Sequence, residues 1–400
     1  MASRKKKTVD PTFALVEELV ASGRFDLGTP DRIEELMSMV NRALREKAER
    51  SAREEGRGGG GVLAGTVASM LAEGFTRDEV DEELTRRWGA PASDEDWTEA
   101  LALLERERAG VFSTPLPTVL PLVFFDSIPI LMAVPGRASL PPGAPVVDVD
   151  ACPGVDSDDD PVGHAGAGRI PGRAVERRRL MISVAVLEDG SRRVLEARVA
   201  PRGAVSGGRR LPGSLWRSVF ASLAERGLRR IVLAVTDGGE DVGGVLAEEL
   251  PGSVEQAGVV PLAFISSGLC GRTGRGGSPV KRLLASEDPA GALEALESLE
   301  ARHPAAGALW RAAWPRVEGF FAFPPGVRRM IHTTNLVDAL MPAVAKCVAR
   351  RGAFASEKEA ECLAARALAV KSARWRCASK ARAEVVRLVL ERLDAGARES

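Results

Sequence analysis

The sequence lacks tyrosine, has three histidines and carries no excess of charge of either sign. Lysine and arginine together number 55, as do aspartate and glutamate. Because the formal net charge is zero, any nucleic-acid interface has to come from local basic patches and not from bulk composition. The histidines (His164, His303 and His332) lie too far apart in the sequence to show a metal-binding spacing. The hydrophobic fraction of 45% is nevertheless ordinary for a globular protein with a sizeable core.

Cysteine is also scarce, and the chain has no C-x-x-C pair. The five cysteines are Cys152, Cys270, Cys347, Cys362 and Cys377. This odd and widely spaced set is typical of a reducing cytosol and argues against a disulfide framework or a zinc knuckle. The basic run Arg4–Lys7 is followed by no apolar core, and no uncharged apolar stretch reaches about 18 residues. We therefore expect a cytoplasmic protein without a signal peptide or a membrane span.

Helical periodicity fills the first quarter of the chain. We expect N-terminal helices over residues 1–57, a glycine linker at Gly58–Gly61 and a compact helical unit over residues 62–112. Within that unit, Thr76 and Glu79 have the spacing of a capping box.

The unit of residues 62–112 has two interpretations. It could be a helix-turn-helix, which places the start of its last helix in the major groove of DNA. Here that start is acidic, with Asp94, Glu95 and Asp96, and these charges would repel phosphate. A small helical packing unit fits the pattern as well, so both interpretations stay open.

Strand signals begin after residue 113. An apolar run at Val119–Phe125 is typical of a buried strand, and further strands are expected at Leu180–Leu187, Arg193–Val199 and Arg230–Thr236. The turn Glu188–Ser191 joins two of them as a hairpin. With a helix at about 215–226, residues 113–245 read as the first part of a mixed α/β core.

Two other parts of the chain differ in composition. Residues 135–177 are rich in proline, glycine and aspartate and have no periodicity, so we expect a disordered insertion there. Residues 246–325 are expected to be a helical insertion, with helices at about 279–301 and 305–320. Residues 326–400 should complete the core, with helices at about 335–350, 356–370 and 378–394.

Three aspartates could form a metal site. Asp126 and Asp237 each follow a strand-like run, and carboxylates at strand ends of one sheet can converge on a rim that suits Mg²⁺. An aspartate after a strand is also a common way to begin a turn, as in the sequence Asp237-Gly238-Gly239. Asp338 stands three residues after Asn335, an expected N-cap, where a carboxylate could complete the site or simply favour the helix dipole.

The stretch from Trp310 to Leu368 resembles the C-terminal catalytic region of Mutator-type bacterial insertion-sequence transposases. The resemblance rests on FFAFPPGVRRMIHTTNLVDAL followed by ARRGAF, which include the motif residues Thr333, Thr334 and Asn335. SLWRSVFASLAERGLRRIVLAVTDG and LPLVFFDS are similar to the segments that carry the family's second and first catalytic aspartates. AEGFTRDEVDEELTRRWGAPAS resembles the helical DNA-binding region that precedes the catalytic domain.

The resemblance implies a fold, a reaction and partners. The fold would be a ribonuclease-H-like mixed sheet with a helical insertion and an N-terminal all-helical region. Asp126, Asp237 and Asp338 would be both the catalytic residues and the ligands of two Mg²⁺ (or Mn²⁺) ions. The partners would be the ends of the mobile element and target DNA, handled by a homo-oligomer in the cytoplasm at the nucleoid.

The sequence departs from the family at several positions. Asp338 stands where the family has glutamate, and Pro342 follows within the expected helix, where proline costs about 3 kcal/mol. Gly258 and Pro261 replace a cysteine and a histidine of the family, and the insertion at 135–177 follows the first aspartate. The N-terminal region is also shortened and lacks the family's basic segment. These departures favour a transposase of impaired activity or, as the alternative, an inactive remnant that binds DNA or protein.

Local basic residues supply candidate DNA contacts. They are Arg328, Arg329, Arg350, Arg351, Lys371, Arg374 and Arg376. Trp375 lies among the last of them, and basic residues around an aromatic suit backbone contact with some stacking. A solvent-exposed helical face would have the same composition, so that interpretation also stays open.

Overall fold

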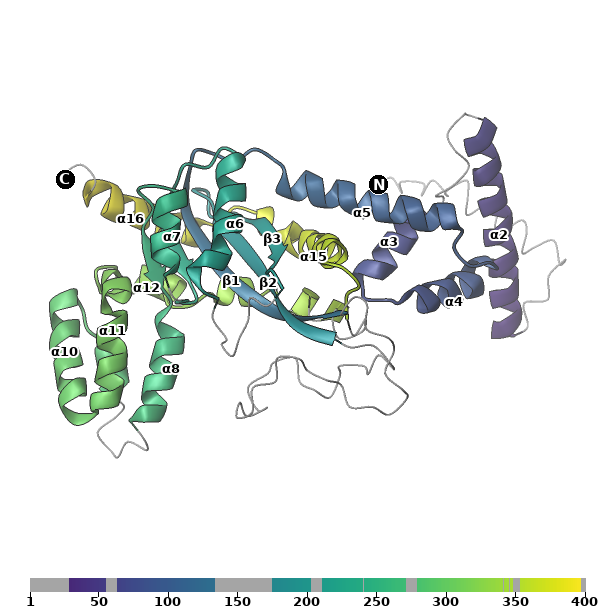
Figure 1. Cartoon of the computed structure of the whole chain (residues 1–400). Helices are drawn as coiled ribbons and strands as arrows, with labels where there is room; N and C mark the ends of the chain where they lie inside the picture. The colour runs from purple at the N-terminus through teal and green to yellow at the C-terminus, as the bar shows by residue number, and fades with distance from the viewer. Residues whose placement is uncertain are drawn as a thin grey trace, which may run out of the picture. The chain divides into compact units, whose positions relative to one another are not determined.

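The computed structural model describes residues 29–54, 63–133, 175–202, 211–239, 241–270, 279–340, 342–344, 346–347 and 353–396. The chain divides into two compact units (Figure 1). One comprises Met1–Leu71 and Phe75–Leu103, and the other comprises Ala72–Gly74 and Leu104–Ser400. The predictions for residues 1–28, for Gly58–Gly61 and for residues 135–174 lie outside the described residues.

The first unit is helical, as predicted. It contains α2 (Pro30–Glu54), α3 (Ala64–Ala72), α4 (Arg77–Trp88) and the first half of α5 (Asp94–Phe112). The predicted capping box at the start of α4 is confirmed, because the amide of Glu79 donates to Thr76 Oγ1 at 3.3 Å and the amide of Thr76 donates to Glu79 Oε2 at 2.8 Å. These bonds satisfy amides that the first helical turn leaves without partners.

One acid of the α5 N-terminus is used inside this unit. Asp96 is buried, and its carboxylate accepts from the amides of Ser93 at 3.0 Å and Leu63 at 2.9 Å. Asp96 therefore caps α5 and anchors the start of α3. Glu95 and Asp94 remain exposed, so the acidic character of this helix start is reduced but not removed.

The second unit is built on a five-stranded sheet in the order β3-β2-β1-β4-β5. Its strands are β1 (Val119–Ala133), β2 (Val175–Val186), β3 (Arg192–Val199), β4 (Arg230–Thr236) and β5 (Glu255–Ala257). The β1–β2 and β2–β3 pairs are antiparallel, whereas β4 runs parallel to β1 and β5 runs parallel to β4. The predicted mixed α/β class is confirmed.

β1 is longer than predicted. The expected strand ended at Phe125, but the ladder with β2 continues from Asp126, opposite Ile182, to Ala133, opposite Val175. β4 ends at Thr236, opposite Phe125, so Pro129 can occupy β1 although it has no N–H to donate. The prediction that residues 175–177 belong to a disordered insertion is therefore wrong, because they are the first residues of β2.

The hairpin between β2 and β3 is confirmed. The amide of Leu187 donates to the carbonyl of Ser191 at 2.9 Å, and Gly190 has a φ of 75°. That left-handed conformation costs glycine little, because glycine has no Cβ.

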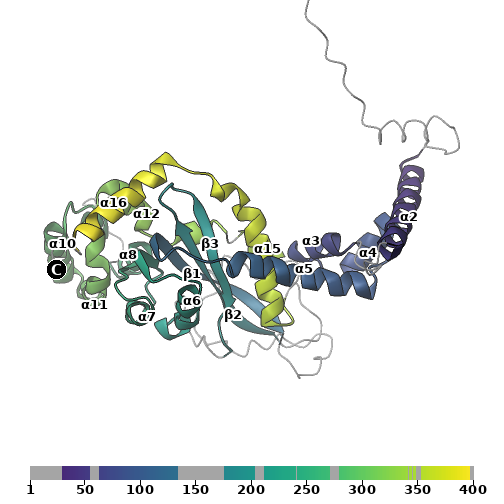
Figure 2. The same ribbon diagram turned by 90° about the horizontal axis from the view of Figure 1, so that it is seen from above.

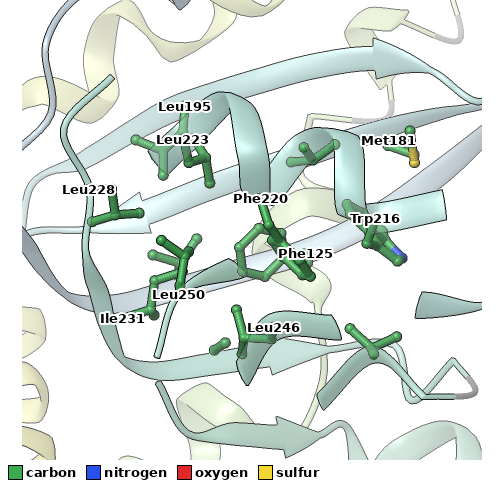
Figure 3. Packing of buried hydrophobic residues seen from close by; sticks show 14 of the residues in the cluster. Phe125, Met181, Leu195, Trp216, Phe220, Leu223, Leu228, Ile231, Leu246 and Leu250 are labelled. Atoms are coloured by element: carbon green, nitrogen blue, oxygen red, sulfur yellow. The ribbon is translucent and has the colours of Figure 1, made fainter. Parts of the chain in front are cut away.

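Helices cover both faces of the sheet. On one face, α6 (Gly213–Glu225) and α7 (Val242–Glu249) pack over a buried apolar cluster that includes Phe125, Trp216 and Phe220 (Figure 3). On the other face, α15 (Glu357–Ser372) packs against β3, and α16 (Lys380–Gly396) packs against β1 and β4 (Figure 2). The sheet is thus buried between two layers of helices, as a mostly apolar set of strands requires.

In its described residues, 246–270 and 279–325, the segment predicted as a helical insertion contains one strand and four complete helices. β5 lies within residues 246–325 and was not predicted, and α8 (Val259–Leu269), α9 (Pro279–Leu284), α10 (Pro289–Arg302) and α11 (Pro304–Phe321) follow it (Figure 1). The single helix expected at 279–301 is divided into α9 and α10. Asp288 starts α10 by accepting from the amide of Gly291 at 2.8 Å, with Pro289 at the first helical position.

The helix predicted at 335–350 is interrupted after its first turn, although residues 342–344 and 346–347 are again helical. α12 (Pro325–Ile331) leads to α13 (Asn335–Asp338), which ends after four residues. Pro342 explains the end, because it has no N–H for the carbonyl of Asp338, its partner in a continuous helix. The N-cap is Thr334 and not Asn335. No described helix is long and apolar enough to cross a membrane.

Candidate active site

Asp126 on β1 and Asp237, which directly follows β4, occupy neighbouring positions in the fold. β1 and β4 pair in parallel up to Phe125 and Thr236, and the next residues after this last pair are Asp126 and Asp237. Asp126 is half-buried and Asp237 is buried. Side chains alternate along a strand, so Asp126 points away from the cluster that holds Phe125 and toward the face that carries α16. The structure therefore brings together two of the three predicted acids.

The Thr-Thr-Asn motif contacts Asp126 directly. Thr334 Oγ1 donates to Asp126 Oδ2 at 2.5 Å, across 208 residues of sequence. The amide of Ser127 donates to Asp126 Oδ1 at 2.6 Å. Thr334 is buried, as is Thr333, whose hydroxyl donates to Asn335 Oδ1 at 3.0 Å. Both oxygens of Asp126 thus have a fixed donor, which orients the carboxylate.

Backbone bonds place this motif across the ends of β4 and β5. The amides of Val259 and Val260 donate to the carbonyl of His332, at 2.9 and 3.1 Å, and the amide of Gly258 donates to the carbonyl of Thr236 at 2.8 Å. A Cβ at Gly258 would lie 3.2 Å from that carbonyl oxygen and 3.5 Å from the Cα of Thr333. Gly258, where the family resemblance places a cysteine, therefore permits a close approach of the motif to the sheet.

Asp237 follows the last residue of β4 and begins a tight turn. The amide of Gly239 donates to Asp237 Oδ1 at 3.0 Å, and Gly238 has a φ of 82°. A Cβ at Gly239 would lie 2.0 Å from the carbonyl oxygen of Leu211, so only glycine fits there. The turn-forming and site-forming interpretations of Asp237 are compatible, because the turn holds the carboxylate at the sheet edge.

The third acid is described only through its backbone. Asp338 is the last residue of α13, and α13 packs against β1 and β2. Its side chain lies outside the described residues. Among the described side chains, no group of three His, Cys, Asp or Glu residues could hold a metal ion. Asp126 and Asp237 supply the hard oxygen donors that suit Mg²⁺ or Mn²⁺, and they fit part of such a site.

Two charged residues beside Asp237 have no signal in the sequence. Glu255 on β5 accepts from Thr236 Oγ1 at 2.7 Å, and Arg316 on α11 donates to the same carboxylate. Glu255 lies in a strand of three residues, and Arg316 stands 61 residues away, so no local pattern joins them.

Arg328 has a packing role. It is 9% exposed, its guanidinium stacks near the rings of Phe320 and Phe321, and burial lowers its pKa. Its donors are committed to the backbone carbonyls of Ser286, Glu287, Phe321 and Phe323. A guanidinium with these partners joins α12 to the loop before α10 and is poorly placed to contact phosphate.

The other predicted DNA contacts divide into described and undescribed residues. Arg329 and Lys371 are exposed. Arg350 and Arg351 lie outside the described residues, and only the backbone of Arg374 and Arg376 is described, in the 3-10 helix η2 (Ala373–Arg376). Trp375 is buried with the Arg192 guanidinium 4.1 Å from its ring centre, so it is not placed for stacking on a base.

The two neighbouring arginines should behave differently when each is replaced by lysine. Arg328→Lys keeps a charge but cannot reproduce the fork of donors, so we expect it to lower the free energy of unfolding by about 2 kcal/mol. Arg329→Lys should change stability by less than about 0.5 kcal/mol. Urea denaturation followed by circular dichroism measures both. Equal and small effects would contradict the packing role of Arg328.

Known proteins are similar to this chain over a region that includes part of the candidate site. The model of the family described as "Transposase, Mutator family" matches residues 169–378, which include Asp237, Thr334 and Asp338. The chain is 27% identical over 306 residues to the "Transposase for insertion sequence element ISRM3" of Rhizobium meliloti, an alignment that covers 74% of this chain and 64% of the relative. It is also 29% identical over 198 residues to a "Probable transposase for insertion sequence element" of Corynebacterium diphtheriae, covering 47% of this chain and 55% of the relative.

A similar match to the "Probable transposase for insertion sequence element ISRM3-like" of Sinorhizobium fredii has 26% identity and again covers 64% of the relative. The chain thus spans less than two thirds of the length of the relatives named here. The family model, by contrast, covers more than half of the chain and includes the turn of Asp237 and the motif that contacts Asp126. This chain belongs to the Mutator family of transposases.

Proposed function

We propose that the chain is a DNA transposase that cleaves the strands at the ends of an insertion sequence and joins them to target DNA in a metal-dependent phosphoryl transfer. The observation that carries the proposal is the neighbouring placement of Asp126 on β1 and Asp237 directly after β4, with Thr334 bonded to Asp126. The sheet order, with an antiparallel β1–β2–β3 meander and parallel β4 and β5, supports a ribonuclease-H-like core.

Each residue of the proposed site has a defined task. Asp126 and Asp237, completed by Asp338, would hold two Mg²⁺ or Mn²⁺ ions. Bound there, the ions would supply Lewis acidity toward the phosphate and a lowered pKa for a coordinated water or 3′ hydroxyl. Thr334 and the amide of Ser127 orient Asp126, and the amide of Gly239 orients Asp237. Such fixed donors hold the ligands in the geometry that metal binding needs.

DNA would approach through exposed basic side chains. Arg329 and Lys371 are exposed and are the first candidates, together with Arg350, Arg351, Arg374 and Arg376. Arg328 is left out because its donors are bonded to carbonyls. Contacts of lysine and arginine to phosphate position a duplex without reading its sequence. The partners of the reaction would be the element ends and the target, bound by a homo-oligomer.

A second candidate function is an inactive, transposase-derived remnant that binds DNA or protein. The observation that favours it is the end of α13 at Asp338, followed by Pro342. An aspartate in place of the family's glutamate is one methylene shorter, and a misplacement of about 1 Å can lower a rate about a hundred-fold. If the third acid no longer binds metal, the chain would keep the sheet and the DNA contacts but would not cleave DNA strands.

A strand-cleavage assay separates the two candidates. The substrate is an end-labelled duplex that carries the terminal repeats flanking the gene, incubated with the full chain and Mg²⁺ or Mn²⁺. We expect nicks at the repeat ends that EDTA abolishes, and we expect Asp338→Glu to raise the rate by up to about a hundred-fold. Cleavage that persists in EDTA would contradict the metal-dependent mechanism. Binding of the duplex without cleavage by either form would favour the remnant.

A further inference from the structure

A charged pair joins the helical segment to the edge of the sheet. Glu255 on β5 and Arg316 on α11 form a two-pronged ion pair, with Arg316 Nη2 2.5 Å from Glu255 Oε1 and Arg316 Nε 3.0 Å from Glu255 Oε2. The Glu255 side chain is 7% exposed and that of Arg316 is 29% exposed. Paired N–H···O bonds of this kind fix both the distance and the plane of the two groups.

This pair reaches the turn of Asp237 from both sides. Before Asp237, Thr236 Oγ1 donates to Glu255 Oε1 at 2.7 Å. After it, Arg316 Nη1 donates to the carbonyl of Gly238 at 3.3 Å. The amide of Gly238 closes the arrangement by donating to Thr236 Oγ1 at 3.2 Å. The residues on either side of Asp237 are therefore bonded to the same ion pair.

The two glycines of the turn add backbone freedom next to Asp237. Gly238 and Gly239 follow Asp237, and glycine has more backbone freedom than any other residue. The surroundings of Glu255, by contrast, are tight, since a Cβ at Gly243 on α7 would lie 2.4 Å from Glu255 Oε2. External bonds from Glu255 and Arg316 can thus fix a conformation that the glycines alone would not hold.

α11 is held firmly enough to act as the anchor of this arrangement. Gln256 Nε2, next to Glu255, donates to the carbonyl of Arg316 at 3.3 Å. Nearer the start of α11, Trp310 Nε1 donates to Ser266 Oγ on α8 at 3.0 Å, and both side chains are buried. The position of Arg316 is therefore set by the helical segment and by β5 together.

We propose that Arg316 and Glu255 are positioning residues for Asp237, through which the helical segment α8–α11 sets the geometry of the metal-binding carboxylate. The part of this proposal that concerns metal rests on the proposed function. The part that concerns the turn stands on the contacts alone. Arg316 acts through its bonds to Glu255 and to the carbonyl of Gly238, and Glu255 in turn accepts from Thr236.

Arg316→Gln is the test variant, and Arg311→Gln is its matched control. Arg311 lies on the same helix and pairs with Glu300 on α10 at 2.8 Å, with both side chains exposed by 42%. The first measurement is hydrogen exchange at the amides of Gly238 and Gly239 in metal-free protein. We expect Arg316→Gln to speed exchange there by about ten-fold or more and Arg311→Gln to leave it at the wild-type rate.

The second measurement is Mn²⁺ binding followed by electron paramagnetic resonance. Loss of a group that orients a metal ligand usually weakens binding by about 10–100-fold, so we expect a shift of that size for Arg316→Gln alone. Arg316→Lys, which keeps the charge but not the fork, should fall between wild type and Arg316→Gln in both measurements. If Arg316→Gln does not fold, Arg316→Lys takes its place as the test variant.

The outcomes separate this proposal from the proposed function. Unchanged exchange at Gly238 and Gly239 in both Arg316 variants would overturn the positioning role. Faster exchange with an unchanged Mn²⁺ affinity would overturn the link to the metal-binding carboxylate. Faster exchange in a chain that binds no Mn²⁺ and cleaves no DNA would support the hold on the turn while the transposase mechanism fails.

Discussion

Replacing Asp237 with asparagine is expected to lower metal-dependent strand cleavage by about a thousand-fold or more and to leave the fold intact. The amide oxygen of asparagine can still accept from Gly239, which donates to Asp237 Oδ1 at 3.0 Å, so the turn is preserved. The negative charge that would hold the metal is lost. Metal ions stabilise the transition state by several kcal/mol, and about 1.4 kcal/mol corresponds to a factor of ten in rate.

Asp126→Asn should have a comparable effect for the same reason, since Thr334 and Ser127 already orient that side chain. Glu248→Gln is the matched control. It removes one carboxylate from the exposed face of α7, where Glu248 pairs with Arg217 at 2.5 Å. Cleavage, thermal unfolding and Mn²⁺ binding are measured on all the proteins. Cleavage by Asp237→Asn at the wild-type rate would show that these carboxylates are not the catalytic ones.

Local patterns predicted the parts of the fold that depend on neighbouring residues. β4 has the predicted bounds, Arg230–Thr236, because a short apolar run with a following Asp-Gly turn is a local signal. The hairpin at Gly190 and the capping box at Thr76 are confirmed for the same reason, since turn and cap chemistry involve residues close in sequence.

Features that depend on distant residues were missed. β5 has three residues and becomes a strand only by pairing with β4, so it has no period to detect. The second half of β1 depends on its pairing with β2 across the insertion. The burial of Arg328 could not be predicted from the sequence either. Arg328 and its exposed neighbour Arg329 are the same residue type in the same segment, and only the structure shows the carbonyl partners of Arg328.

The candidate site shows the same division. Asp126 and Asp237 were identified at the ends of apolar runs, but their adjacency follows from the parallel register of β1 and β4. The bond from Thr334 to Asp126 spans 208 residues, and only the resemblance to the family pointed to that motif. Neither the local patterns nor the family resemblance indicated the ion pair of Glu255 and Arg316, because it arises where a short strand meets a helix of the insertion.

Trp216→Ala is expected to lower the free energy of unfolding of the unit that contains the sheet by about 3–5 kcal/mol, the range for a large aromatic removed from a core. Trp216 on α6 is 1% exposed and lies edge-on to Phe125, with the ring centres 5.6 Å apart. It also stacks near Phe220 at 6.4 Å, and Phe220 lies 5.1 Å from Phe125 (Figure 3). Such pairs add about 0.5–1.5 kcal/mol to the burial of area.

Trp314→Ala is the control for this prediction, and Trp216→Phe is the conservative variant. Trp314→Ala removes the same side chain from α11, where Trp314 is only half-buried and stacks on Phe321 at 5.7 Å, so its effect should be smaller. Trp216→Phe retains an aromatic ring in the cluster and should cost less than Trp216→Ala. Urea denaturation followed by circular dichroism measures all three. Because Phe125 directly precedes Asp126 on β1, Trp216→Ala should also reduce cleavage at temperatures where the sheet is still folded. A stability loss below about 1 kcal/mol for Trp216→Ala would mean that this cluster does not hold α6 on the sheet.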